Sequence, residues 1–157
     1  MPDPISITQI SQRTRLGDEG ERLAAIYLSG RGYNLIISNF TVPVGRNSKG
    51  VQVTGEIDIV ALDAEGVLCF VEVKTRTSEA FAGPLSAVDL RKQRQITRTS
   101  KIYKRVFGLW KTASRFDVVT VVMRPDSEPK LELIRGFWNA DKFRKRRWEP
   151  DIYHQNF

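Results

Sequence analysis

Residues 55–74 read GEIDIVALDAEGVLCFVEVK, and this stretch decides the fold of the chain. It contains an apolar run at 57–62 and a second at 67–73, separated by a segment from Asp63 to Gly66 with the composition of a turn. Short apolar runs bounded by turn residues are typical of buried strands. We therefore expect a hairpin of two largely buried strands.

The hairpin carries charged side chains where burial is costly. Because side chains alternate along a strand, Glu72 and Lys74 share a face, and Asp58 converges with Glu72 across the hairpin. Two carboxylates this close repel each other unless a cation lies between them, and an unpaired buried charge costs several kcal/mol. A shared Mg²⁺ or Mn²⁺ would offset that cost. With Lys74 positioning water or stabilising charge on a phosphate, the group would form a catalytic site for phosphodiester hydrolysis.

An ordinary amphipathic hairpin is the alternative for the same residues. In that interpretation Asp58 and Glu72 point into solvent, and Lys74 pairs with one of them. The E-x-K pattern alone favours this alternative, because short motifs match by chance. The combination of both acids and the lysine with an early helical glutamate favours the metal site.

Glu21 is that glutamate, and it lies in a predicted amphipathic helix. The buried stripe of the helix is formed by Leu16, Gly20, Leu23, Ala24 and Tyr27. At about 100° per residue, Glu21 falls at the margin of this stripe, from which it can reach a neighbouring metal. An ordinary surface glutamate would occupy the same position.

A basic segment follows the hairpin. The chain has a net charge of +7 and a pI near 9.8, and residues 90–115 contain no Asp or Glu. Within a predicted helix, an apolar side is formed by Val88, Ile96, Thr99, Tyr103 and Val106, and a basic stripe by Arg91, Arg94, Arg98, Lys101 and Arg105. Lys92 lies on the apolar side, where it either snorkels to solvent or reaches toward the acidic site together with Gln93. Both residues are expected to belong to the same interface as the basic stripe. The basic residues predict a nucleic-acid interface, with a solvated basic face as the alternative.

Taken together, these stretches resemble a known family. They are GDEGERLAAIYLSGRGYNLIISNF at 17–40, the 55–78 segment that begins with GEID, AVDLRKQRQITRTSKIYKR at 87–105 and RFDVVTVV at 115–122. The chain resembles the YraN-like family of uncharacterised bacterial proteins, within the PD-(D/E)xK nuclease superfamily. That superfamily includes Holliday-junction resolvases and tRNA-endonuclease-like domains. The resemblance implies an α/β, restriction-endonuclease-like fold, a mixed β-sheet flanked by helices with an αβββαβ core. It also implies metal-binding roles for Glu21, Asp58 and Glu72, with Lys74 completing the catalytic set.

The rest of the chain sets the expected boundaries. We expect a flexible N-terminal segment at 1–14, one endonuclease-like domain at 15–138 and a basic tail at 139–157. Residues 41–54 form either a longer hairpin or a substrate loop. Segments 115–123 and 131–137 are predicted strands, and Asp117 in the first is expected to pair with a nearby Arg or Lys.

Composition excludes several classes of protein. No apolar run approaches a membrane span, so a cytoplasmic protein is expected. Cys69 is the single cysteine and His154 the single histidine, which argues against an intrachain disulfide, a histidine zinc site and a Ser-His-Asp triad. The three tryptophans are Trp110, Trp138 and Trp148. We expect them to anchor the core or the tail, and stacking on nucleic-acid bases is the alternative.

These observations predict a nucleic-acid-binding protein that is a Mg²⁺- or Mn²⁺-dependent endonuclease, with DNA as the expected nucleic acid. One alternative is a non-catalytic nucleic-acid-binding module that keeps the nuclease-like fold. Another is a protein-interaction domain with an acidic partner, which would show neither metal affinity nor strongly salt-dependent nucleic-acid binding. A homodimer is compatible with each interpretation.

Overall fold

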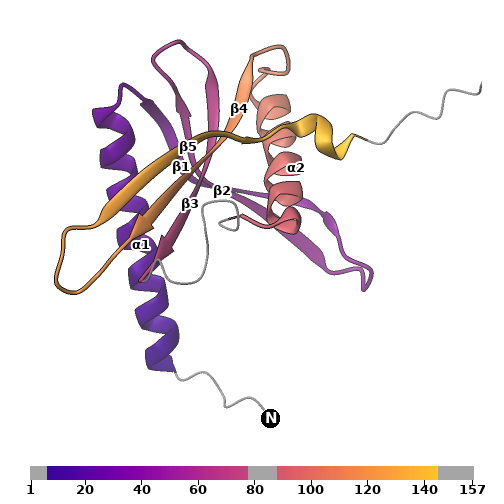
Figure 1. The fold of residues 1–157 in the computed structure, drawn as a ribbon. Helices are drawn as coiled ribbons and strands as arrows, with labels where there is room; N and C mark the ends of the chain where they lie inside the picture. The colour runs from indigo at the N-terminus through magenta and orange to yellow at the C-terminus, as the bar shows by residue number, and fades with distance from the viewer. Residues whose placement is uncertain (1–6, 78–87, 145–157) are drawn as a thin grey trace, which may run out of the picture.

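The computed structural model describes residues 7–77 and 88–144 and has the expected α/β architecture. A five-stranded mixed sheet has the order β1-β2-β3-β4-β5, with β3 and β4 parallel and all other neighbours antiparallel. The elements along the chain are α1 (Ile7–Gly30), β1 (Asn34–Arg46), β2 (Gln52–Leu62), β3 (Leu68–Arg76), α2 (Leu90–Val106), β4 (Ser114–Val122), β5 (Lys130–Trp138) and the 3-10 helix η2 (Ala140–Phe143). Figure 1 shows this arrangement. It is consistent with a restriction-endonuclease-like fold.

The hairpin predicted from residues 55–74 is present as β2 and β3. Its turn is closed by the Asp63 carboxylate, which accepts hydrogen bonds from the backbone N–H groups of Glu65 and Val67, both at 2.9 Å. Gly66 adopts φ +81°, a conformation that favours glycine. The apolar runs on both sides are buried, and Cys69 lies within the second of them.

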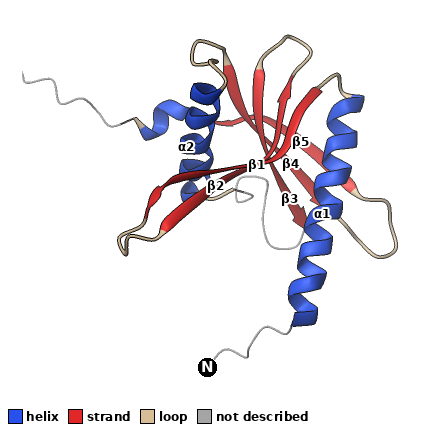
Figure 2. Ribbon diagram, turned by 180° about the vertical axis from the view of Figure 1, so that it is seen from behind, coloured by secondary structure: helices blue, strands red, loops and turns tan. Residues whose placement is uncertain are grey.

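Two hydrophobic cores lie on opposite faces of the sheet, each covered by one helix (Figure 2). On one face α2 packs against a core that includes Val60, Phe70 and Val118. On the other, α1 packs through Ala24 and Leu28. Gly20 lets α1 approach β3 closely, because an added Cβ would lie 1.9 Å from the Thr75 Oγ1 atom. The two helices therefore hold the central strands between them.

Residues 41–54 extend a β-hairpin instead of forming an irregular loop. The far end of the β1–β2 hairpin passes alongside α2 and projects beyond the sheet (Figure 1). Three contacts attach it to α2: Arg98 donates to the Val44 carbonyl, Gln95 donates to the Thr54 carbonyl at 2.9 Å, and the Thr99 hydroxyl abuts Gly55. The hairpin is thereby a fixed arm beside the helix.

The exposure of two side chains, Val106 and Trp110, differs from expectation. Val106 is exposed, because α2 ends there and the chain turns away from the core. Trp138 is buried in the α2-side core, as expected, but Trp110 is exposed. Trp148 and His154 lie outside the described residues. None of the helices at 7–77 and 88–144 has the length and apolarity that a membrane span requires.

An ion-pair network at the opposite end of β2 and β3 from the acidic pair confirms the expected pairing of Asp117. This carboxylate is fully buried and accepts from Arg115 at 2.7 Å, and Arg115 also donates to Asp63 at 2.9 Å. Tyr33 adds a hydrogen bond to Asp117 at 3.2 Å. Because these groups are mutually paired, the network is a structural one.

Candidate metal centre and nucleic-acid interface

The two acids of the hairpin lie where β2 and β3 separate. The hydrogen-bonded register runs from Leu62↔Leu68 to Ile59↔Val71, so its continuation places Asp58 opposite Glu72. At that point the Asp58 carboxylate accepts a hydrogen bond from the Val73 backbone N–H at 2.8 Å. Where the two strands separate, a hydrogen bond from the Val73 backbone to the Asp58 side chain thus replaces the backbone–backbone hydrogen bonds.

Side-chain alternation along β2 breaks at the same position. Ile57 belongs to the core beneath α2, whereas Ile59 belongs to the core beneath α1, although strict alternation would put both on one face. The β1–β2 hairpin leaves the plane of the sheet here to pass alongside α2 (Figure 1). Asp58 therefore lies at the break and is close to acids from both sides of the sheet.

Glu72 is the most perturbed of these acids. Its side chain is buried, and its Oε2 atom has no hydrogen-bond partner among the residues that the structure describes. Burial, reinforced by the negative charge of Asp58, raises the pKa of Glu72 from 4.5 to about 8. Lys92 opposes this increase from 3.6 Å away. An unsatisfied buried acceptor costs about 1–3 kcal/mol, so either a proton or a cation at this carboxyl group would be stabilising.

Glu21 approaches the same point from α1. Its partial burial and the charges of Asp58, Glu56 and Asp18 raise its pKa to about 7. A hydrogen bond with Asn39 acts in the opposite direction. The fold thus brings all three predicted acids into one electrostatic neighbourhood, with Glu56 as a further acid at its exposed edge.

Asn39 is a member of this neighbourhood that sequence reasoning missed. It is the non-glycine residue with positive φ, at +54°, in the described ranges 7–77 and 88–144. The pairs Ser38↔Ile59 and Phe40↔Ile57 flank it, so it lies across from Asp58. Asparagine tolerates this left-handed conformation better than most residues, which is the only signal the sequence offers.

The acids can accommodate a divalent cation through two carboxylates. Within the described part of the chain, no cluster of three acidic, histidine or cysteine side chains is close enough to enclose a metal ion. Mg²⁺ does not need such a cage, because it keeps several waters and binds through one or two carboxylates together with substrate phosphates. Asp58 and the unpartnered Glu72 oxygen match that requirement, and Glu21 lies beside them.

The two lysines differ in position. Lys74 is exposed and extends from β3 two residues beyond Glu72, on the face expected from alternation. The ammonium nearest to Glu72 is that of Lys92 on α2. Lys74 is thus free to meet a substrate from solvent, whereas Lys92 is engaged with the acid.

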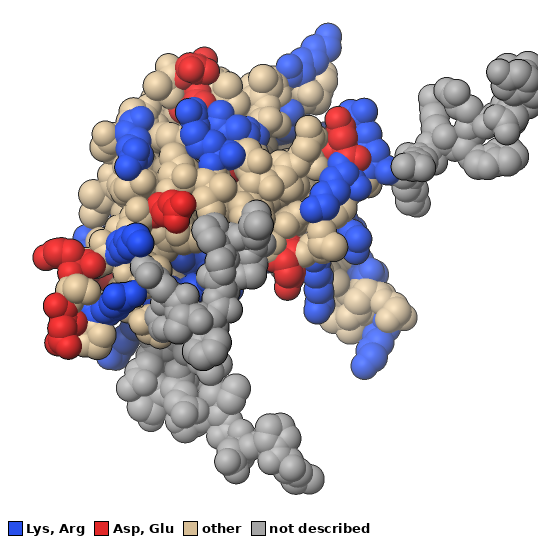
Figure 3. Space-filling view, viewed as in Figure 1, with Lys and Arg blue, Asp and Glu red and all other residues tan. Residues whose placement is uncertain are grey.

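The basic stripe of α2 is exposed as predicted, at Arg91, Arg94, Arg98, Lys101 and Arg105. Lys and Arg side chains gather on the right-hand side of Figure 3, over α2, η2 and the β1–β2 hairpin. A pocket of about 410 Å³ between α2 and the hairpin is lined by Val44, Val53, Asp89, Arg91, Lys92, Arg94, Gln95 and Arg98. A second, of about 370 Å³, is lined by Arg94, Thr97, Arg98, Lys101, Lys142, Phe143 and Arg144. The two pockets adjoin because they share Arg94 and Arg98, and together we call them the basic groove. Lys92 lines the first pocket and lies 3.6 Å from Glu72.

Gln93 does not face this groove. Its amide is buried, donates to the Val88 carbonyl at 2.8 Å and accepts from Lys142 at 3.1 Å. Because Gln93 follows Lys92 directly on the helix, its side chain points in a different direction, toward Val88 just before α2 and Lys142 in η2. These contacts lie within the fold and do not include the acidic pair that Gln93 was expected to approach.

Comparison of the chain with known proteins identifies the family to which it belongs. Residues 20–121 match Uncharacterised protein family UPF0102. A UPF0102 protein of Trichlorobacter lovleyi is 42% identical over 119 residues, which cover 76% of this chain and 86% of that protein. One from Desulfosudis oleivorans is 37% identical over 132 residues, covering 84% and 96%. A solved structure titled "Crystal structure of SSO0001" covers 86% of this chain and 58% of its own, with 17% identity and a TM-score of 0.40, which is too weak a likeness to carry an argument.

Proposed function

Because the chain belongs to the uncharacterised protein family UPF0102, its activity has to be inferred from its own site, and we propose that it is a Mg²⁺- or Mn²⁺-dependent endonuclease. The observation that carries the proposal is the buried Asp58–Glu72 pair with the unpartnered Glu72 Oε2 atom, next to Lys92, which lines the basic groove. An acidic pair would repel a phosphodiester in the absence of a cation. A cation held there would attract one.

Each residue then has a distinct task. Asp58 and Glu72 would hold the cation, and Glu21 would complete or orient its shell of waters. A bound divalent cation supplies charge stabilisation for the phosphate and lowers the pKa of a coordinated water. Lys74 would position the attacking water or stabilise the charge that develops on the phosphate.

The basic groove would hold the nucleic acid, with DNA as the expected form. Arg91, Arg94 and Lys101 present their charges to solvent along one side of α2, and none of them has an acidic partner among the described side chains. Phosphates would meet these charges without displacing an existing ion pair. Lys92 would keep the groove continuous with the acidic pair.

Cleavage of a substrate panel tests the proposal. The panel contains duplex, single-stranded, flapped and four-way-junction DNA and RNA, each with Mg²⁺ and with Mn²⁺. We expect Asp58→Asn to abolish both cleavage and Mn²⁺ binding measured by calorimetry. Lys74→Ala should keep both binding steps and reduce cleavage by a factor on the order of 10²–10³, the scale for loss of one electrostatic stabiliser. Cleavage that is indifferent to both substitutions would point to a contaminating nuclease and refute the proposal.

The second candidate is a nucleic-acid-binding module without catalysis. One observation favours it: Lys92 already lies 3.6 Å from Glu72 and partly neutralises this acid without a metal. A wild-type protein that binds the panel but cleaves no member with either cation would support this function. Glu72→Gln would then leave nucleic-acid affinity unchanged.

A further inference from the structure

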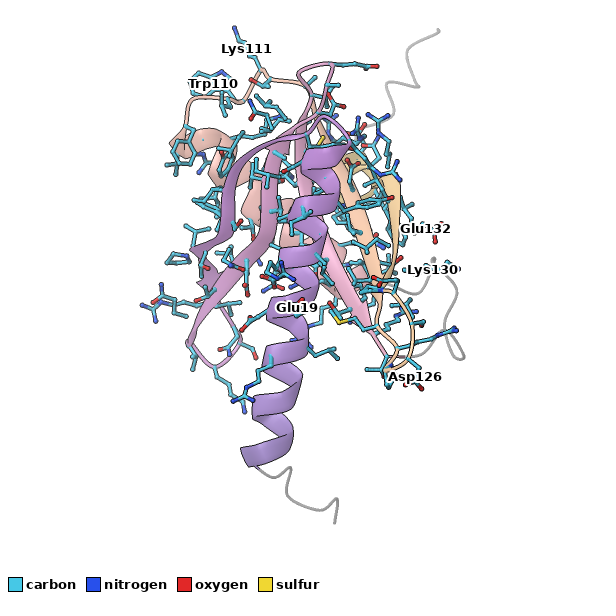
Figure 4. The ribbon with its side chains drawn as sticks, turned by 90° about the vertical axis from the view of Figure 1, so that its left-hand side faces the viewer. Glu19, Trp110, Lys111, Asp126, Lys130 and Glu132 are labelled. Carbon is cyan, nitrogen blue, oxygen red and sulfur yellow. The ribbon has the colours of Figure 1, made fainter. Side chains whose placement is uncertain are left out.

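Large apolar side chains are exposed where α2 ends. Trp110 is 66% exposed and Phe107 is 53% exposed, although residues of this size are usually well buried. Figure 4 shows Trp110 and Lys111 on the loop after α2, standing away from the body of the sheet. The two rings are therefore available to a partner.

Contacts within the loop hold its backbone and the Phe107 ring in place. The backbone N–H of Phe107 donates to Tyr103 at 3.1 Å, and that of Leu109 donates to Lys104 at 2.6 Å. The Lys104 ammonium crosses the loop to the Thr112 carbonyl at 2.8 Å and the Ser114 hydroxyl at 3.1 Å. The Phe107 ring also packs against the Tyr103 ring, with centroids 4.6 Å apart. A partner would therefore meet a Phe107 ring that is already packed and a Trp110 that projects from a braced loop.

The charge around the rings identifies the kind of partner. Lys101 and Arg105 are exposed on the last turns of α2, Lys111 follows Trp110, and residues 90–115 contain no acid. A second copy of the chain would bring the same positive charge against this end, which disfavours self-association. Unpaired nucleotides combine a polyanion with flat apolar faces, and they match both features.

We propose that Phe107 and Trp110 stack on unpaired bases of a nucleic acid whose phosphates follow the basic stripe of α2. The inference rests on the proposed function and names its substrate class: a nucleic acid with a single-stranded segment beside the position of cleavage. The helix from Lys92 to Val106 is roughly 20 Å long at 1.5 Å per residue, so the unpaired segment would span about six nucleotides at 3.4 Å per stacked step.

Fluorescence anisotropy with labelled oligonucleotides tests this assignment. The probes are a single strand, a blunt duplex, and the same duplex with unpaired tails of two, six and ten nucleotides. We expect Trp110→Ala to weaken binding of the single strand and the long-tailed duplexes roughly tenfold or more, equivalent to about 1.4 kcal/mol, and to leave blunt-duplex binding unchanged. Trp110→Phe should retain most of the affinity, because a ring remains.

Val106→Ala is the matched control, since Val106 is 63% exposed at the same end of the helix but has no ring. It should change no affinity. Equal losses on all probes with Trp110→Ala, or no loss on any probe, would overturn the inference.

The same experiment distinguishes failure of the stacking proposal from failure of the proposed nuclease function. If Arg91→Gln weakens binding of every probe while Trp110→Ala has no effect, the nuclease proposal survives and the stacking platform is refuted. If the wild-type protein binds none of the probes, both are refuted. A dimer in sedimentation that Trp110→Ala dissociates would assign the rings to self-association and overturn the inference.

Discussion

Replacing Glu72 by glutamine should stabilise the metal-free protein, and the gain should grow with pH. Burial and the charge of Asp58 raise the pKa of Glu72 to about 8, from 4.5 in the unfolded chain. The folded protein therefore holds this proton more tightly. The corresponding stability is fully present below pH 4.5 and is lost as pH rises toward about 8. Glutamine cannot ionise, so the Glu72→Gln variant keeps this stability at high pH.

The size of the effect follows from the two pKa values. Their difference sets an upper limit on the order of 5 kcal/mol at pH 9, at about 1.4 kcal/mol per pH unit. Structural relaxation where β2 and β3 separate, and solvent near the half-buried Lys92, will make the effect smaller than this limit. We therefore expect the variant to gain roughly 2–4 kcal/mol in unfolding free energy, or about 5–15 °C in Tm for a domain of this size. At pH 5 the two proteins should differ by much less.

Chemical denaturation at pH 5, 7 and 9 with a chelator measures this difference through tryptophan fluorescence, to which the buried Trp138 contributes. Glu65→Gln is the control, because Glu65 is exposed in the β2–β3 turn, and its stability should follow the wild type at each pH. Added Mn²⁺ should stabilise the wild type and narrow its gap to Glu72→Gln. A Glu72→Gln protein that is no more stable at pH 9, or whose advantage does not depend on pH, would refute the reasoning.

Three further outcomes are expected. Replacing Arg91 and Lys101 with glutamine should weaken duplex binding and flatten the plot of log affinity against log salt by roughly 0.9 for each lost contact, in a filter-binding salt titration; an unchanged slope would place the interface elsewhere. Gly20→Ala should destabilise the fold by about 1–3 kcal/mol in denaturant titrations, because the new methyl group meets Thr75, and Thr75→Ala should restore part of the loss. Asn39→Ala should cost about 1 kcal/mol and Asn39→Gly less, since glycine accepts positive φ; equal losses would show that the backbone is not the cause.

Local patterns predicted most of the elements. Alternating and continuous apolar runs identified β2, β3, β4 and β5, and helical periodicity identified α2 with its basic stripe. These predictions succeeded because side-chain period and turn chemistry act over a few neighbouring residues. The same periodicity misassigned Val106, since the position at which a helix ends and leaves the core depends on distant segments.

The sequence identified several residues of the candidate site, but it did not predict how they are arranged. Asp58, Glu72 and Glu21 were recognisable as acids on buried or half-buried elements, and in the structure the charge of Asp58 contributes to the raised pKa of each glutamate. Asn39 and the contact between Lys92 and Glu72 were not, because each joins residues far apart in the chain. Trp110 gave no local sign of its exposure, which depends on how the loop after α2 is tied to Lys104.

The sequence alone therefore determined most of the strands and helices and the charged residues that they carry. Only the tertiary structure decided where β2 leaves β3, and that separation sets the site: Asp58 lies at the break in alternation, within reach of acids on both faces of the sheet. The physical reason is that periodicity is a local property of the chain. The divergence of two strands arises from long-range packing, here the attachment of the β1–β2 hairpin to α2 through Arg98 and Gln95.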